Sequence, residues 1–455
     1  MIRFDTVVLG GGLPGMVAGL IAQSDKRERT VLVIESASRL GGGMAGCIAM
    51  GVEFDLGTHI PQETGIARID NLFKLAIRTE ILQRLTSSVG DRAGWMVNGR
   101  VYSDSAYLDI LQLDPNLASA VLEHVTSSWA KSGELSGKSS RQCPVETVAE
   151  SWYGSVVSRE LILPMMHKWF GDSESLSGFV LELANMSRLR VADETRWRSL
   201  ASSANFRSRV AFPFQGRLPS QYQHNRMSLY PRNGTAAAFV SGFAALCRSR
   251  EIELLLDARV QAIDLSNRVI TVLHANEQHE IKYGQLISTL GPLTTLQLLG
   301  GEATTGIERV SHYFVHHILS GPIESELCYL YVSANSSPVF RVTNYRAFSG
   351  RDDDCRLTTE ILSTKTIAPD FAVSESEDIL RSSNFLGQNQ IVRSAVSLSR
   401  SSFPRPTLSL FNQFHTAAIQ ISPLENDSFI VTGIGANGEM FFQNEILRHV
   451  SSKLP

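Results

Sequence analysis

The first residues whose types and spacing could do chemistry are three glycines near the start of the chain. Gly10, Gly12 and Gly15 have the spacing G-x-G-x-x-G, directly after the apolar run 6–9 and directly before a helical stretch that begins at Met16. In this motif Gly10 permits a tight turn, Gly12 leaves room for a pyrophosphate against the backbone, and Gly15 lets the helix pack closely on the strand. The N-terminus of the helix then faces the phosphates. The spacing therefore predicts a dinucleotide site.

An acidic residue and a second glycine-rich stretch follow this motif. Glu35 ends a second apolar strand, residues 30–34, where its carboxylate can accept hydrogen bonds from both ribose hydroxyls. The next residues include Arg39, Gly42 and Gly43, which would let a second backbone segment approach the ligand. Flavoproteins that hold FAD along its whole length often have such a segment, so the pattern favours FAD over a nicotinamide cofactor.

The remaining residues that could do chemistry are few. The segment Asp55-Leu-Gly57-Thr58-His59 could return the chain to the isoalloxazine end of the cofactor, and we expect His59 to lie near the flavin. The residues His312, His316 and His317 lie in an aromatic, apolar stretch, which favours core or pocket-wall positions over metal ligands. The sequence shows no Ser–His–Asp set, no paired-carboxylate site and no zinc-ligand spacing. We therefore expect no metal, and we expect flavin N5 to carry the chemistry.

Composition limits the class of protein. With 455 residues, 43% apolar and 19% charged, the chain can bury the cores of two or more domains. A formal net charge of −3 gives no electrostatic case for binding nucleic acid or a membrane surface. Glycine and proline interrupt the N-terminal apolar run, which is too short to span a membrane. Five cysteines without paired spacing favour reduced thiols and a cytoplasmic location.

The elements that must position these residues predict a discontinuous α/β fold. We expect a Rossmann-like FAD-binding domain from residues 1–95, 226–300 and 416–455. An inserted α+β substrate domain would take up residues 96–225 and 301–415.

Local patterns predict the individual elements. The expected elements are helices in 61–90 and 107–186, a hairpin at Asn98-Gly99, strands in 252–289 and half-buried strands in 305–350. Residues 187–210, rich in Arg and Ser, predict a loop, either a solvated surface loop or a lid over an anionic substrate. Residues 351–415 give no clear pattern. A last strand, 428–432, leads into a glycine turn and a helix, which would bring Gly433 and Glu439 to the cofactor.

The order of these motifs resembles a known group of flavoproteins. An acid, then R-x-G-G, then D-x-G-x-H is similar to the FAD domain of UDP-galactopyranose mutases, protoporphyrinogen-oxidase-like proteins and flavin amine oxidases, and the resemblance continues over most of the chain. It implies that Val260 contacts the cofactor from the second segment. It also implies that the closing turn with Gly433 and Glu439 completes the FAD site.

On the substrate side the resemblance is to the mutases. Lys168-Trp169-Phe170-Gly171 is similar to their Lys-x-Trp-Gly motif, which implies that Phe170 stacks on uracil. The stretch with Arg341 and Tyr345 matches the strand where the mutases carry an arginine that grips the substrate diphosphate, a task that suits the fork of a guanidinium. The alternative for Arg341 is a structural ion pair.

The chain also departs from the mutases. Thr235 stands where they have tyrosine, and Ile434 stands where their closing motif has arginine. Met440, Phe441 and Phe442 follow in place of tyrosines whose hydroxyls could reach a sugar or a phosphate.

Three hypotheses for function remain open. The first is an FAD-dependent enzyme of polysaccharide biosynthesis that acts on a nucleotide-linked sugar or glycan precursor through flavin N5, with an external reductant such as NAD(P)H. The second is an FAD oxidase or desaturase with an apolar substrate. The third is a flavin-binding protein that has lost catalysis. The sequence does not predict the oligomeric state.

Overall fold

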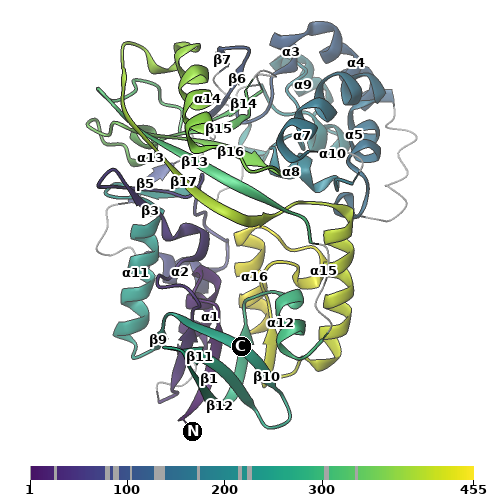
Figure 1. Ribbon diagram of the computed structural model, residues 1–455. Helices are drawn as coiled ribbons and strands as arrows, with labels where there is room; N and C mark the ends of the chain where they lie inside the picture. The colour runs from purple at the N-terminus through teal and green to yellow at the C-terminus, as the bar shows by residue number, and fades with distance from the viewer. Residues whose placement is uncertain are drawn as a thin grey trace.

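Two large β-sheets and a group of helices form most of the part of the chain that the structure describes (Figure 1). The structure is a computed structural model. It describes all residues except 1, 25–27, 77–81, 86–91, 103–104, 128–138, 172–174, 214–217, 223–227, 302–306, 334–336 and 455.

The first sheet has seven strands and carries the glycine motif. Its strands run in the order β10-β11-β12-β1-β2-β9, and β18 pairs with the C-terminal end of β12, residues 286–288. The strands are β1 (Ile2–Leu9), β2 (Val31–Ile34), β9 (Glu253–Leu255), β10 (Ala258–Asp264), β11 (Val269–His274), β12 (Glu277–Ser288) and β18 (Phe429–Val431). The pairs β18–β12, β12–β1, β1–β2 and β2–β9 are parallel. The predicted Rossmann-like α/β fold is confirmed, and the strands of this sheet come from three separate stretches of chain.

The register of this sheet brings the glycine motif and the acid to one edge. Leu9 lies opposite Ile34, and the backbone N–H of Gly10 donates to the carbonyl of Ile34 at 2.8 Å. Gly10 and Glu35 therefore leave the sheet together, at the carboxyl ends of parallel strands, where ligands of such sheets bind. Helices pack around the sheet (Figure 1): α1 (Leu13–Ser24), α2 (Ala67–Ala76), α11 (Ala236–Ser249), α12 (Pro292–Leu298), α15 (Leu408–Ile421) and α16 (Gln443–Lys453).

The second sheet also has seven strands, in the order β17-β13-β16-β15-β14-β6-β7. The strands are β6 (Ala93–Val97), β7 (Arg100–Tyr102), β13 (Arg309–Leu319), β14 (Tyr329–Val332), β15 (Val339–Asn344), β16 (Arg356–Ser363) and β17 (Ile391–Pro404). All neighbours are antiparallel except β14 and β6. The predicted domain boundary after residue 95 falls inside β6, so this part of the chain already belongs to the second sheet. Two short sheets pair β3 (Cys47–Ala49) with β4 (Val52–Phe54) and β5 (Leu82–Leu85) with β8 (Ser228–Pro231).

The strands in 305–350 are buried on both faces, so the prediction of half-buried strands is wrong. Every residue of β14 is buried. Leu330 packs into a core with helix α14 (Pro369–Arg381), whereas Tyr329 and Tyr331 pack into the core of a helical lobe on the opposite face. A strand covered on both faces has no reason to alternate polar and apolar residues.

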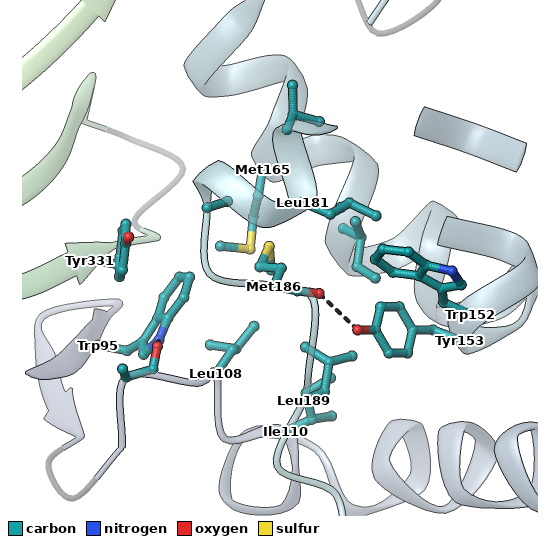
Figure 2. Close-up of a cluster of buried hydrophobic side chains, with 14 of the residues drawn as sticks. Trp95, Leu108, Ile110, Trp152, Tyr153, Met165, Leu181, Met186, Leu189 and Tyr331 are labelled. Carbon is teal, nitrogen blue, oxygen red and sulfur yellow. Dashed lines mark hydrogen bonds between the residues drawn. The ribbon is translucent and has the colours of Figure 1, made fainter. Parts of the chain in front are cut away.

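The helical lobe lies beside the second sheet (Figure 1). Its core consists of large side chains (Figure 2). Its α-helices are α3 (Ile110–Leu113), α4 (Pro115–Ser127), α5 (Val145–Tyr153), α6 (Ser155–Val157), α7 (Leu163–Phe170), α8 (Phe179–Leu183), α9 (Glu194–Leu200) and α10 (Ala204–Arg209). Trp95 stacks on Tyr331 with ring centroids 4.9 Å apart. The buried hydroxyl of Tyr153 donates to the carbonyl of Met186 at 2.8 Å (Figure 2). The predicted helices of 107–186 are confirmed where the structure describes that stretch.

Residues 187–210 are neither of the two predicted loops. Most of the stretch forms helices α9 and α10, because Trp197 and Phe206 pack into the core of the lobe, and residues 187–193 lead into them without helical structure. The guanidinium of Arg190 is buried against Asp109 at 3.0 Å, so it does not grip a substrate from a lid.

Other local predictions have mixed outcomes. The hairpin is confirmed, with Asn98 and Gly99 both at positive φ between β6 and β7. The predicted helix of 61–90 is shorter, since residues 61–66 are not helical, α2 runs from Ala67 to Ala76 and β5 follows at Leu82. Residues 77–81 and 86–90 lie outside the described residues. Within the described part of the chain, no helix combines the length and the apolar character that crossing a membrane requires.

Candidate functional site

The glycine motif has the geometry that a bound pyrophosphate needs. A methyl group on Gly15 would lie 1.8 Å from the carbonyl oxygen of Gly10, so close packing of α1 on the turn requires glycine there. A methyl group on Gly12 would meet only the Cδ atom of Pro14, at 3.6 Å. The space beside Gly12 is therefore free of protein, as expected where a phosphate approaches the backbone.

Glu35 and Val260 lie on one small cavity. One carboxylate oxygen of Glu35 accepts from the backbone N–H of Gly11 at 2.7 Å, and the other accepts from the backbone N–H of Ala37 at 2.8 Å. The cavity has a volume of about 240 Å³, and its lining includes Gly10, Glu35 and Val260. The structure thus brings together three residues that the sequence assigned to the cofactor. Their contact with a ligand stays a prediction.

The second glycine stretch lies next to the first. The backbone N–H of Gly41 donates to the carbonyl of Gly11 at 2.9 Å, and Arg39, Gly42 and Gly43 are exposed. A methyl group on Gly43 would lie 3.5 Å from the Cε1 atom of His59. The exposed backbone of this stretch therefore leads from the glycine motif toward His59.

The closing turn meets the same place from a third direction. A methyl group on Gly433 would lie 2.4 Å from the carbonyl oxygen of Thr289, and one on Gly10 would lie 2.6 Å from the Thr289 hydroxyl oxygen. Thr289 therefore lies directly between the closing turn and the glycine motif. Glu439 is half-buried at the end of this turn, and its carbonyl accepts from Arg141 at 2.6 Å.

A buried carboxylate that the sequence reasoning missed lies close to Gly57. Glu360 of β16 is fully buried, and Arg341 of β15 binds it with both arms of its fork, Nε to Oε1 and Nη2 to Oε2, each at 2.7 Å. The Nε2 atom of His312 lies 3.0 Å from Oε2 of Glu360, and the Thr58 hydroxyl lies 3.3 Å from Oε1. We call Glu360, Arg341, His312, Thr58 and the adjoining His59 the Glu360 cluster.

The ionisation states of the Glu360 cluster follow from its contacts. The Arg341 guanidinium holds the pKa of Glu360 well below its usual range despite the cost of burial. Burial lowers the pKa of His312 and of His59, so both rings are neutral at pH 7. The cluster therefore carries one positive and one negative charge, and its net charge is zero.

Asp55 forms the centre of a second buried group, with Tyr230, Tyr345 and Arg356, which we call the Asp55 cluster. The Tyr230 hydroxyl and the Ala236 backbone N–H donate to the two oxygens of Asp55, the latter at 2.8 Å. The guanidinium of Arg356 instead faces Asp354 at 2.7 Å. Because burial outweighs these contacts, the pKa of Asp55 is raised to about 7.

Two residues predicted to bind substrate lie in the protein interior. The ring of Tyr345 is fully buried, and its hydroxyl accepts from the backbone N–H of Asp55 at 2.8 Å. Phe170 is 4% exposed and packs in the core of the helical lobe, so its ring has no free face for uracil. Both predictions are therefore corrected: these aromatic side chains fill cores, as most aromatic side chains do. The ion pair that was the alternative for Arg341 is present.

One signal could have revealed Glu360 in the sequence. It is the single charge between Leu357 and Leu362, in a strand that is buried along its length. A charge in such a strand requires a partner and so marks a buried pair. Within the described residues no group of three or more potential metal-ligand side chains gathers, so the structure offers no metal site there.

Comparisons with known proteins identify the domain that carries the glycine motif. Residues 8–74 match the model of a NAD(P)-binding Rossmann-like domain. No protein of curated function matches the sequence.

Similar solved structures cover nearly the whole chain. Reduced UDP-galactopyranose mutase superposes with a TM-score of 0.73 at 16% identity, over 99% of this chain and 94% of the other. A protein assigned as a protoporphyrinogen oxidase, from Exiguobacterium sp. 255-15, gives 0.66 at 14% identity, over 100% and 98%. A cofactor-binding double mutant of putrescine oxidase gives 0.59 at 12% identity, over 99% of each chain. The resemblance seen in the sequence is confirmed at the level of the fold: this chain carries a Rossmann-like dinucleotide-binding domain within the architecture shared by these three proteins.

Proposed function

We propose that the protein is an FAD-dependent enzyme. The observation that carries this proposal is the meeting of three glycine segments at one edge of the sheet. Gly10 and Gly433 both approach Thr289, and the backbone N–H of Gly41 donates to the carbonyl of Gly11. Glu35 and the open space beside Gly12 lie at the same edge. When bound, FAD would supply an isoalloxazine ring that accepts or donates a hydride. The similarity in fold to two proteins with oxidase names and to a mutase in its reduced state supports this choice.

Each residue of the site would have a distinct task. The Glu35 carboxylate, oriented by two backbone N–H groups, would accept hydrogen bonds from the ribose. Gly12 would leave room for the pyrophosphate, and the exposed backbone of Gly42 and Gly43 would follow the ligand toward His59. The Nε2 atom of His59 lies 3.0 Å from the carbonyl of Leu56, which fixes the ring's tautomer with the proton on Nε2. The Nδ1 atom is then an acceptor.

A matched pair of glycine substitutions tests the cofactor. Gly12→Ala adds a methyl group to free space, so the apoprotein should keep its stability while its affinity for FAD falls by about tenfold or more, as one lost phosphate contact would produce. Gly15→Ala places a methyl group against the Gly10 carbonyl and should destabilise the apoprotein itself. Flavin absorbance and thermal unfolding measure the two effects. A wild-type protein that cannot be reconstituted with FAD would refute the proposal.

The Glu360 cluster favours an oxidoreductase whose substrate is uncharged where it meets these side chains. Net positive charge favours binding of a diphosphate, whereas this cluster sums to zero. The two aromatic residues expected to contact a nucleotide sugar, Phe170 and Tyr345, are buried in cores. Anaerobic reduction of the bound flavin by a panel of neutral alcohols, amines and lipids tests this class.

A mutase acting on a nucleotide sugar is the second candidate, and one observation favours it. The Nη1 group of Arg341 donates no hydrogen bond within the described part of the chain, and the side chain is 18% exposed. This group could still bind a phosphate oxygen. Addition of UDP and UDP-galactopyranose to the reduced protein tests the candidate. A shift in the flavin spectrum with isomerisation of the sugar would favour the mutase over the oxidoreductase, and an unchanged spectrum would exclude it.

A further inference from the structure

Arg141 has an unusually complete set of hydrogen-bond partners. Its Nε and Nη2 groups face the carboxylate of Glu182 at 3.5 and 2.8 Å. Its Nη2 and Nη1 groups face the two oxygens of Glu445 at 2.8 and 3.2 Å, and Nη1 also donates to the carbonyl of Glu439 at 2.6 Å. All five N–H donors of the guanidinium are therefore accounted for.

These partners belong to two different parts of the molecule. Arg141 and Glu182 lie in the helical lobe, Arg141 in a short 3₁₀ turn and Glu182 in α8. Glu439 and Glu445 lie in the closing segment, after the turn that contains Gly433. One guanidinium thus ties the inserted lobe to the third cofactor-binding segment.

The surroundings of Arg141 make this tie rigid. The side chain is 10% exposed, and its guanidinium lies over the ring of Phe179 at 4.7 Å and over that of Phe442 at 5.7 Å. Arginine suits such a site because its planar fork forms several parallel hydrogen bonds and stacks on aromatic faces. Its own backbone carbonyl is held by the Ser177 hydroxyl at 2.6 Å.

The contacts of Glu445 extend the tie into the backbone of the closing segment. Its Oε2 atom accepts from the backbone N–H groups of Phe441 and Phe442, at 2.9 and 3.0 Å. The backbone N–H of Gly435 donates to the carbonyl of Met440 at 2.7 Å and closes the turn. Arg141 therefore holds the C-terminal side of the turn directly, and the Gly435–Met440 hydrogen bond connects that side to the part of the turn that approaches Thr289.

The closing turn, residues 433–442, contains no Lys or Arg. In the helix that follows, Arg448 donates to the carbonyl of Thr64 at 3.1 Å and Lys453 pairs with Glu425 at 3.0 Å. No Lys or Arg occurs between Arg405 and Arg448, and the exposed Ile434 follows the first glycine of the turn. The positive charge that offsets Glu445 and holds the Glu439 carbonyl therefore has to come from another part of the chain.

We infer that Arg141 is a positioning residue of the cofactor site: from the helical lobe it fixes the closing turn, and retention of the cofactor depends on this contact. The inference rests on the proposed function, because it takes the closing turn as part of the FAD site. It also means that the lobe and the dinucleotide domain stabilise each other through the same turn.

A matched pair of variants tests the inference. Arg141→Met removes the tie, and Arg190→Met removes an equally buried arginine whose partner, Asp109, also lies inside the lobe. The rise in flavin fluorescence after dilution measures the release of FAD. Release should be about tenfold faster in Arg141→Met, because several hydrogen bonds to charged groups are lost. In Arg190→Met it should stay within about twofold of the wild type, although both variants lose stability. Equal release rates in the two variants would overturn the inference.

A second variant covers the case in which Arg141→Met does not fold. Glu182→Gln weakens only the lobe side of the tie and leaves the contacts of Arg141 with Glu445 and Glu439 in place. We expect severalfold faster FAD release and faster hydrogen exchange of the backbone amides in residues 433–442, also in the apoprotein. Unchanged exchange there would contradict the inference. A wild type that binds no FAD would contradict the proposed function instead, and the exchange measurement would still test the tie.

Discussion

Asp55 and Glu360 are two buried carboxyl groups whose pKa values are shifted in opposite directions. Asp55 is 2% exposed and Glu360 is fully buried, so each loses its hydration on folding. Asp55 receives hydrogen bonds from neutral donors and its pKa is raised to about 7, whereas Arg341 binds Glu360 and holds its pKa well below the usual range. Burial alone therefore does not decide the charge; the direct partner does.

The contributions of the two carboxylates to the free energy of unfolding should depend on pH in opposite directions. Asp55 has a folded pKa above its unfolded value of 3.8, so its contribution to stability is fully present below pH 3.8 and is lost as the pH rises toward 7. Glu360 has a folded pKa below its unfolded value of 4.5, so its contribution is present above pH 4.5 and is lost as the pH falls.

Removal of the cation beside Glu360 should have the largest effect. Arg341→Met leaves a fully buried carboxylate without its ion-pair partner, which should lower the free energy of unfolding by about 3–5 kcal/mol. Urea unfolding at pH 7 measures this loss. The double variant Arg341→Met/Glu360→Gln removes both charges and should recover most of the stability. A loss of less than about 1 kcal/mol in the single variant would contradict the view that this pair holds Glu360 ionised.

A change at Asp55 should alter the slope of stability against pH. Asp55→Asn imitates the protonated carboxyl group at every pH, so the wild type should lose stability relative to this variant as the pH rises from about 4 to 7. The total difference should be on the order of 4 kcal/mol, because the pKa rises from 3.8 to about 7 and each tenfold change in proton affinity corresponds to about 1.4 kcal/mol. Urea unfolding at several pH values measures it. Parallel curves for the two proteins would show that Asp55 is ionised in the folded state.

Loss of a single neutral donor to Asp55 should cost less. Tyr230→Phe removes the hydroxyl that donates to this carboxyl group, and we expect the free energy of unfolding to fall by about 2 kcal/mol at pH 8. Tyr153→Phe is the matched control, because its buried hydroxyl donates to an uncharged carbonyl (Figure 2) and should cost about 1 kcal/mol. Chemical denaturation of both variants gives the comparison. An equal loss in both would mean that the acceptor's charge has no influence.

The smallest effect is expected at the edge of the Glu360 cluster. Thr58→Val removes a hydroxyl that lies 3.3 Å from Oε1 of Glu360 and 2.7 Å from the Thr343 hydroxyl, while Arg341 stays in place. The expected loss is about 1 kcal/mol, since the main partner of Glu360 remains. Thermal unfolding measures it. A loss as large as that of Arg341→Met would assign the stabilisation of Glu360 to its hydrogen bonds rather than to the cation.

The sequence predicted some parts of the molecule better than others. The glycine motif, the strands of the first sheet and the Asn98-Gly99 hairpin depend on local backbone requirements, and they were predicted correctly. The stretch 187–210 was not, because its many Arg and Ser residues concealed the buried Trp197 and Phe206. The predicted substrate contacts of Phe170 and Tyr345 were wrong for a related reason. A motif gives the type of a residue but not the direction of its side chain.

By itself the sequence determined the turn chemistry of this protein: the positions where only glycine fits, the acid at the end of the second strand, and the order of the three segments that supply them. Those features are local, and spacing along the chain is enough to specify them. Only the tertiary structure decided which charges meet. Arg341 and Glu360 come from neighbouring strands, and Arg141 joins segments about 300 residues apart. Such pairs depend on packing across the fold, and their burial, which fixes pKa and charge, exists only once the fold has formed.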